Sequence, residues 1–239
     1  MTHELTIHEQ LLQFPLFLGM SYDDLMEVAG HTVFEFRNIA AGQVVVAEGS
    51  PCTHIWLLTS GSVTAETAAA GGAYSVEETL SAPLMLQPER LFGINSRHTS
   101  TFMTAEDCSF ISIEKQEVFL LLETQIVFRL NMLNLMATRV QRLEQYAWRQ
   151  ASRTLRERLV RFLLSHSLYP AGRKTFHILM RQLADELNAS RLEVSEILNG
   201  LQKEGLLHLH RGRIEIPMME RLIMAHDIKA MHSRSESSQ

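Results

Sequence analysis

The stretch from residue 123 to residue 150 contains neither glycine nor proline, and its apolar residues recur in steps of three and four. This pattern predicts one long α-helix, which at about 1.5 Å per residue would extend roughly 40 Å. One apolar stripe along it consists of Ile126, Leu130, Leu133, Ala137, Val140 and Ala147. A second stripe consists of Met132, Met136, Leu143 and Tyr146. Because a helix that is apolar on two faces must cover two things, we expect a dimer seam on the first stripe and a β-domain on the second. A long core helix in a monomer is the alternative.

The sequence before this helix, from about residue 32 to residue 113, consists of short alternating runs separated by small turn residues. The runs are Thr32–Arg37, Gln43–Ala47, Ile55–Leu58, Ser62–Thr67, Ser75–Leu80, Thr101–Thr104 and Ser109–Ile113. Many short strands at such intervals predict a β-sandwich or barrel. Residues 5–30 are predicted to be helical, with Ser21 as the cap of a helix. The helical pattern that starts near Glu114 is expected to continue to about residue 165.

Charge is distributed unevenly along the chain. Residues 1–148 contain 7 Lys and Arg against 17 Asp and Glu, whereas residues 149–239 contain 15 against 10. The basic second part is expected to attract a polyanion. With 46% hydrophobic and 21% charged residues, the chain has ample material for a folded core.

Several protein classes are excluded by the sequence. Cys52 and Cys108 lie too far apart for a disulfide framework or a cysteine-only metal site. No apolar run reaches the roughly 18 residues needed to cross a bilayer, so no membrane partner is expected. The first residues carry acid where a signal peptide carries base, which favours a cytoplasmic protein. The cupin-type metal set of His and Glu on neighbouring strands is missing, so we expect no enzyme activity.

Residues 180–207 show the pattern of two short helices joined by a tight turn. Leu183, Ala184 and Leu187 would pack the first helix, and Asn188-Ala189 would form the turn. Ser190 is placed to cap the second helix, and Gly205 to end its segment. The apolar positions of the second helix are Val194, Ile197, Leu198 and Leu201. This pattern predicts a helix-turn-helix, in which the second helix enters a DNA major groove.

A strand–turn–strand follows the second helix. Leu206–His210 and Ile214–Ile216 flank a basic tip of Arg211, Gly212 and Arg213. Arginines at the tip of such a wing suit contacts to phosphate. A plain helical bundle, the alternative, does not account for the wing, the polar helix face and the basic charge together.

The order and spacing of these motifs resemble the Crp/Fnr superfamily of bacterial transcription regulators over nearly the whole chain. The motifs that carry the resemblance begin at Gly42-Gln-Val, Ile55-Trp-Leu, Leu91-Phe92-Gly93 and Ala105-Glu-Asp, and continue with the long helix and the winged helix-turn-helix. The resemblance implies an α+β architecture with an N-terminal jelly-roll (double-stranded β-helix) sensor domain, a dimerisation helix and a C-terminal winged helix-turn-helix. We expect these parts at 1–122, 123–150 and 151–230, with a hinge near 150–154 and a disordered tail at 231–239. It also implies a homodimer that binds a two-fold symmetric site in double-stranded promoter DNA, with RNA polymerase as a candidate partner.

The departures from the family pattern concern the effector. Members that bind cyclic nucleotides have Phe-Gly-Glu, and then Arg-Ser-Ala just before the next strand, so that Glu accepts from the ribose and Arg pairs with the phosphate. Here Ile94 follows Phe92-Gly93, and counting back from Ala105 places Thr99-Ser100-Thr101 where Arg-Ser-Ala would stand. Arg97 lies two residues early. Cyclic AMP is therefore not expected as the ligand.

The sequence also bears on the iron–sulfur and haem effectors of this superfamily. Residues 1–51 contain no cysteine, which argues against the iron–sulfur cluster of oxygen sensors in this superfamily. Haem stays open, because the chain has eleven His but no spacing that marks one as a ligand. The predicted effector pocket is lined by Phe92, Ile94, Arg97, Ser100, Met132 and Met136.

The predicted DNA contacts divide into two sets. Arg191, Leu192, Ser195 and Glu196 are expected to face the bases; Gln182, Ser190, Lys203, Arg211 and Arg213 are expected to contact phosphates. The main hypothesis is a DNA-binding regulator. The alternative is a small-molecule or haem sensor whose output is a contact with another protein.

Overall fold

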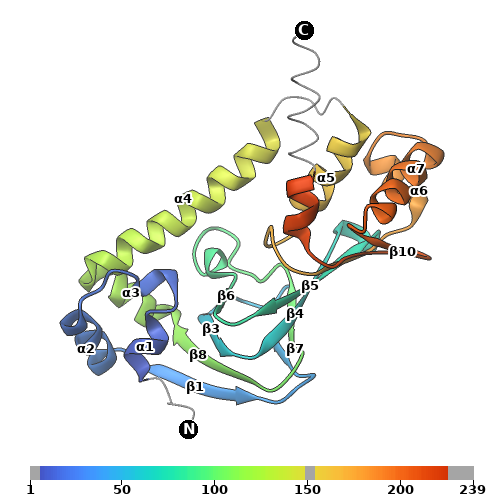
Figure 1. The fold of residues 1–239 in the computed structure, drawn as a ribbon. Helices are drawn as coiled ribbons and strands as arrows, with labels where there is room; N and C mark the ends of the chain where they lie inside the picture. The colour runs from blue at the N-terminus through green and yellow to red at the C-terminus, as the bar shows by residue number, and fades with distance from the viewer. Residues whose placement is uncertain (1–5, 149–153, 226–239) are drawn as a thin grey trace. The chain divides into compact units, whose positions relative to one another are not determined.

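The computed structural model of the chain describes residues 6–148 and 154–225 (Figure 1). These residues belong to two compact units. Unit 1 comprises Met1–Thr64 and Leu80–Glu144, and unit 2 comprises Ala65–Thr79 and Gln145–Gln239. The predicted hinge and tail lie outside the described residues, except Thr154, which caps α5.

Unit 1 begins with helices and continues with a β-sandwich-like set of antiparallel strands. The helices are α1 (Ile7–Leu11), the 3₁₀ turn η1 (Pro15–Phe17) and α2 (Tyr22–His31). One sheet has the strand order β1-β8-β3-β6, formed by β1 (Phe34–Ile39), β3 (His54–Ser60), β6 (Leu84–Leu86) and β8 (Cys108–Glu114). The other strands of the unit are β2 (Val44–Val46), which pairs with β7 (Thr101–Thr104), and the start of β4 (Ser62–Ala68).

The core of unit 1 forms where the N-terminal helices and α4 cover the first sheet. Ile55 and Leu57 of β3 lie opposite Ile113 and Ile111 of the adjoining β8, and all four side chains are buried. Phe128 of α4 is buried in the same cluster. Gly61, between β3 and β4, has φ +91°, and a Cβ there would lie 2.7 Å from the sulfur of Cys108, so only glycine fits this turn.

The helical pattern expected from Glu114 onwards is interrupted at Gln125, which the sequence did not predict. α3 (Lys115–Thr124) and α4 (Ile126–Trp148) are separated by the extended residue Gln125, and the two axes are bent by 114°. Arg129, in the first turns of α4, donates to the carbonyls of Leu122 and Glu123 at the end of α3. This side chain satisfies carbonyls that the break leaves without helical partners, and no glycine or proline marks the break in the sequence.

Unit 2 contains the helices and the small sheet predicted for the second half of the chain. Its helices include α5 (Leu155–Ser165), α6 (Met180–Glu186) and α7 (Arg191–Lys203), and residues 219–225 are also helical. Its strands pair antiparallel in the order β10-β11-β9-β5, formed by β5 (Ser75–Ser81), β9 (Lys174–His177), β10 (His208–His210) and β11 (Arg213–Ile216). The 3₁₀ turn η2 (Ala70–Gly72) precedes β5.

Two strands of the structure, β6 and β9, were not predicted from the sequence. β6 is only three residues long and follows Pro83, and β9 lies in a segment that Pro170 and Gly172 mark as a loop. Both are held by pairing with residues far away in the sequence, β6 with β3 and β9 with β5 and β11. Local patterns carry no information on such partners.

Candidate DNA-binding interface

The turn between α6 and α7 is tight and locally satisfied. Asn188 adopts a left-handed conformation with φ +47°, which asparagine tolerates better than most residues. The amide of Ala189 donates to the carbonyl of Ala184 at 3.0 Å and so closes the end of α6. Leu183 of α6 and Val194 of α7 are fully buried in one cluster, which fixes the two helices against each other.

Ser190 caps α7 as predicted from the sequence. Its hydroxyl accepts from the amide of Glu193 at 3.2 Å, and the carboxylate of Glu193 accepts from the amide of Ser190 at 2.9 Å. These hydrogen bonds to Ser190 lower the pKa of Glu193. The reciprocal capping box leaves α7 with a well-defined first turn, which is the turn a reading helix inserts into the groove.

α7 is divided into a buried and an exposed face. Val194, Leu198 and Leu201 are completely buried. The residues predicted to read bases lie on the other side: Arg191, Leu192 and Glu196 are exposed and Ser195 is half-buried. Leu192 places a large apolar side chain, 70% exposed, on this face. The amide nitrogen of Asn199 donates to the hydroxyl of Ser195 at 3.3 Å, so these two polar groups act together.

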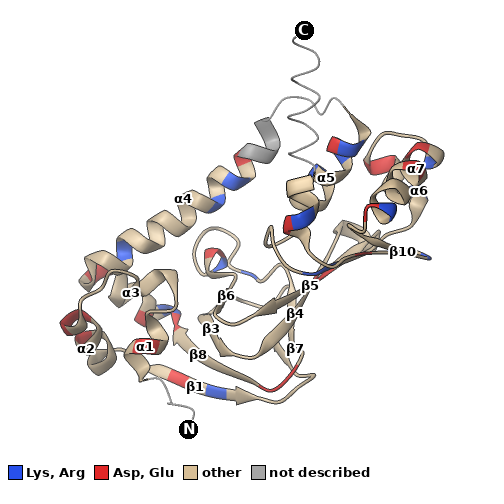
Figure 2. Cartoon of the chain, in the orientation of Figure 1, with Lys and Arg blue, Asp and Glu red and all other residues tan. Residues whose placement is uncertain are grey.

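The predicted phosphate contacts lie around this face. Gln182 is half-buried, and its carbonyl oxygen accepts from the amide of Leu179 at 3.1 Å, where it caps α6. Arg211 is exposed in the turn between β10 and β11, and Arg213 is paired with Glu215 at 2.9 Å. Lys203 is exposed at the end of α7. In the cartoon of Figure 2, both Lys or Arg positions (blue) and Asp or Glu positions (red) occur along the helices and strands of this unit.

α5 supports the two short helices through arginines. Arg156 forms a two-pronged ion pair with Glu204, the C-cap of α7, at 3.0 and 2.9 Å. Arg158 donates to the carbonyl of Leu187, the C-cap of α6, at 3.0 Å. A bidentate arginine pair fixes both distance and direction, so α5 sets the angle at which α7 is presented.

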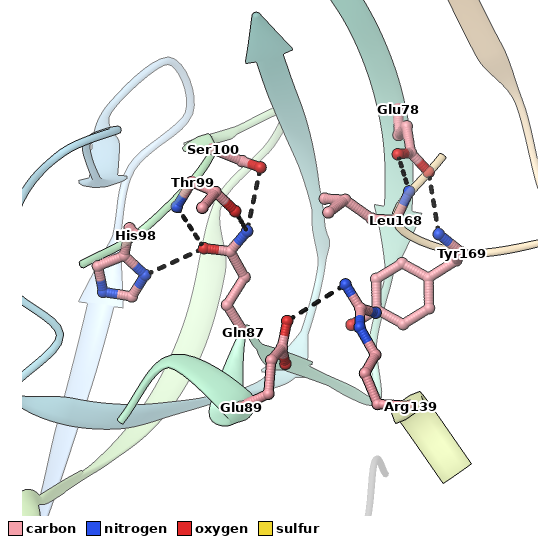
Figure 3. Close-up of polar contacts among 9 residues, drawn as sticks. All are labelled: Glu78, Gln87, Glu89, His98, Thr99, Ser100, Arg139, Leu168 and Tyr169. Atoms are coloured by element: carbon pink, nitrogen blue, oxygen red, sulfur yellow. Dashed lines mark hydrogen bonds and ion pairs between the residues drawn. The ribbon is translucent and has the colours of Figure 1, made fainter. Parts of the chain in front are cut away.

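A buried polar cluster lies in unit 1 where the sequence suggested an effector site (Figure 3). Gln87, 3% exposed and left-handed at φ +45°, precedes the 3₁₀ turn η3 (Pro88–Arg90). Its amide nitrogen donates to the hydroxyls of Thr99 at 2.8 Å and Ser100 at 3.0 Å. Its carbonyl oxygen accepts from the amide of Thr99 at 3.1 Å and lies 3.4 Å from a ring nitrogen of His98.

The partners of Gln87 are the three residues that directly precede β7. They are His98, Thr99 and Ser100, one position earlier than the count from Ala105 suggested. His98 is 3% exposed, and burial lowers its pKa, which favours the neutral ring. Thr99 and Ser100 thus have Gln87, a neutral side chain of the same chain, as a hydrogen-bond partner.

The six residues predicted for the effector pocket are not brought together as a set. Met132 is buried in the core of unit 1, with Phe92 and Met136 packed against that core. Ser100 is buried beside Gln87 instead. Ile94 is fully exposed at the loop tip, and Arg97 is exposed and donates to the carbonyl of Gly49 at 2.6 Å.

Sequence models of two protein families match the chain. A Crp-like helix-turn-helix domain matches residues 157–224, and a cyclic nucleotide-binding domain matches residues 36–125. Together the two matches cover well over half of the chain, in the order that the motifs predicted. The chain belongs to the Crp/Fnr superfamily of transcription regulators.

Several solved structures of regulators are similar to this chain at low sequence identity. The catabolite activator protein of Thermus thermophilus is 22% identical, with a TM-score of 0.47 over 87% of this chain and 96% of that one. DNR from Pseudomonas aeruginosa is 21% identical, with a TM-score of 0.42 over 93% of this chain and 99% of that one. A putative Crp/Fnr regulator from Eubacterium rectale is 21% identical, with a TM-score of 0.48 over 89% and 97%. No curated protein matches the chain.

The long helix of the regulator presents its first apolar stripe to solvent within unit 1. Ile126, Leu130, Leu133 and Val140 are 57%, 51%, 59% and 53% exposed, and Ala137 is exposed with them. Met132 and Met136, from the second stripe, pack against the core. The side chains of Tyr146 and Ala147 lie outside the described residues. Arg139 of α4 also pairs with Glu89 of η3 at 3.2 Å, which links α4 to the turn that follows Gln87.

Other features of the regulator bear on its chemistry. Among residues 6–148 and 154–225, no group of three or more His, Cys, Asp or Glu side chains could hold a metal ion. Cys52 is buried, and burial raises the pKa of its thiol to about 11. No single described helix is long and apolar enough to cross a membrane; α3 and α4 reach that length and apolarity only as the bent pair.

Sequence reasoning missed three polar features: Gln87 with its hydroxyl partners, the Glu89–Arg139 pair, and a buried pair of Glu78 with Lys174. The only local signal was Gln87 before Pro88, since a residue before proline avoids the helical region.

Proposed function

We propose that this regulator binds a two-fold symmetric DNA site as a homodimer and does so without cyclic AMP. The observation that carries the proposal is the exposed face of α7, where Arg191, Leu192 and Glu196 project from a helix that is capped, packed and supported from α5. Rigid presentation of one helix face is what reading a major groove requires.

The side chains on this face suit particular bases. Arg191 is expected to form two hydrogen bonds with the edge of a guanine, and Glu196 to accept from the amino group of a cytosine. Leu192 is expected to contact a thymine methyl group, which gives its exposed apolar side chain a partner. Ser190, Gln182, Lys203, Arg211 and Arg213 would hold the backbone of the DNA and set the register of α7.

The exposed stripe of α4 supports the dimer. Four large apolar side chains that are each more than half exposed repeat along one face, Ile126, Leu130, Leu133 and Val140. Packing this face against the same face of a second chain would bury all of them symmetrically, and a two-fold dimer presents two α7 helices to two half-sites.

The Gln87 cluster supports independence from cyclic AMP. A bound cyclic phosphate needs a cation and donors that are free to turn toward it. Here no arginine stands directly before β7, and the hydroxyls of Thr99 and Ser100, which accept from the amide of Gln87, can offer a phosphate only neutral donors. A cyclic phosphate would also gain no charged partner from His98, whose pKa burial lowers.

The first experiment is selection from a random DNA library with the purified, ligand-free chain. Enrichment of a two-fold symmetric motif with half-sites about one helical turn apart supports the proposal. Addition of cyclic AMP is expected to leave the affinity for the selected site unchanged. Failure to enrich any motif, without or with cyclic AMP, would overturn it, and enrichment only with cyclic AMP would overturn its second part.

A further inference from the structure

A strand from the sensor half of the sequence is built into unit 2. Residues 75–78 of β5 pair with residues 174–177 of β9, with Ser75 opposite His177 and Glu78 opposite Lys174. Val76 is buried in the same core as α6 and α7. The cyclic nucleotide-binding family match, 36–125, includes this strand, although residues 65–79 group with the unit that holds the helix-turn-helix.

The strand carries one end of a buried ion pair. The carboxylate of Glu78 lies 2.6 Å from the ammonium of Lys174, and the two side chains are 1% and 0% exposed. Lys174 also donates to the carbonyl of Ala171 at 2.7 Å. Glu78 accepts from the amides of Leu168 and Tyr169, as Figure 3 shows. One carboxylate therefore holds both the start of β9 and the loop that leads into it.

The position of β9 determines the position of the wing. β9 lies between β5 and β11, with Lys174 opposite Ile216 and His177 opposite Arg213. Arg213 and the adjoining turn residue Arg211 are the wing residues that the proposed function assigns to DNA phosphates. A shift of β9 would therefore move these arginines relative to α7.

We propose that Glu78 is a positioning residue for DNA reading: it holds Lys174, the loop 168–174 and β9 so that the wing keeps its place beside α7. The inference rests on the proposed function for its effect on DNA. Removing the carboxylate leaves the ammonium of Lys174 buried without its partner, and an unpaired buried charge is strongly destabilising. Lys174 then leaves its site, and β9 loses its pairing with β5.

The test uses the full chain with Glu78→Gln, and Glu77→Gln as the matched control. Glu77 is the neighbouring residue on β5, but its side chain is 46% exposed and 4.0 Å from His177, so its loss should change little. Hydrogen exchange of amides 174–177 and 213–216 reports the hold on the wing directly. Affinity for the selected DNA, measured well below the unfolding temperature, reports the consequence.

Glu78→Gln is expected to lose amide protection in β9 and β11 and to bind DNA about tenfold more weakly, since a charge-assisted contact is worth roughly that factor. Glu77→Gln should match the wild type in both. The double variant Glu78→Gln with Lys174→Met, which removes both charges, should regain protection and affinity relative to Glu78→Gln, and it carries the test if the single variant does not fold.

Unchanged protection in Glu78→Gln, or a double variant no better protected than the single one, would overturn the inference. If the wild-type chain selects no DNA, the proposed function fails, while the exchange measurement still decides whether Glu78 holds the wing.

Discussion

Replacing Leu133 by glutamate should dissociate the dimer. Leu133 lies in the middle of the exposed stripe of α4 and is 59% exposed within unit 1. In a symmetric seam the two copies of α4 meet along this stripe, so each chain would place its new carboxylate in the contact.

The size of the effect follows from the exposed area of the side chain. Fully burying a leucine contributes about 1.5–3 kcal/mol, so burying the exposed part of Leu133 contributes about 1–2 kcal/mol per chain. Both chains lose this contribution, and two unpaired carboxylates in the seam cost several kcal/mol more. A total of at least about 5 kcal/mol raises the Kd of the dimer more than about a thousandfold.

Sedimentation velocity over a wide concentration range measures that Kd directly. Thr138→Glu is the matched control, because Thr138 is also exposed on α4 but lies about 140° around the helix from Leu133. The control should keep the dimer and its affinity for a two-fold DNA site. Leu133→Glu should be monomeric and should bind that site no better than a single half-site.

The seam on α4 would be refuted by a Leu133→Glu chain that dimerises as tightly as the wild type. It would equally be refuted by a wild-type chain that binds the two-fold site while it remains monomeric in solution.

The other predictions concern single side chains. Arg191→Ala should weaken binding to the selected DNA by about 1–3 kcal/mol and relax the preference at one base pair per half-site, as measured by titration of a set of point-mutated sites. Ser190→Ala should lower the free energy of unfolding by about 1 kcal/mol through loss of the cap of α7, as measured by urea denaturation. The pKa of His98, measured by NMR titration, should lie below its usual value of about 6.5, because burial disfavours the charged ring. The buried neutral ring then contributes stability that is fully present above about pH 6.5 and is lost as the pH falls through the lowered pKa. Cys52, with its pKa raised to about 11, should resist iodoacetamide at pH 8 in the folded chain and react when the chain is unfolded in urea.

The elements that were predictable from sequence are those whose patterns are local. The α6–turn–α7 motif follows from apolar spacing, the Asn188 turn and the Ser190 cap, and each of these depends on residues within one or two turns. The exposure of the first stripe of α4 was likewise expected from its spacing. The family resemblance then supplied the order of the domains.

The features that the sequence did not predict depend on hydrogen-bond and ion-pair partners that local patterns do not mark. The break at Gln125 is stabilised by Arg129, whose side chain reaches back six and seven residues to carbonyls that no sequence pattern marks. Gln87 finds its hydroxyl partners a dozen residues away, and Glu78 finds Lys174 in another region of the chain. Because a buried polar side chain is placed by whatever partner satisfies it, its position depends on the complete fold.

The left-handed backbone at Gln87 has a consequence for engineering new control into the molecule. A non-glycine residue in this conformation carries a penalty of about 1–2 kcal/mol, which the hydrogen bonds of its side chain offset. Glycine at this position would remove the amide from the space beside Thr99 and Ser100 and relieve the backbone in the same step. A single substitution, Gln87→Gly, would therefore leave the hydroxyls of Thr99 and Ser100 without their amide partner, where a polar group of an added molecule could be tested as a replacement.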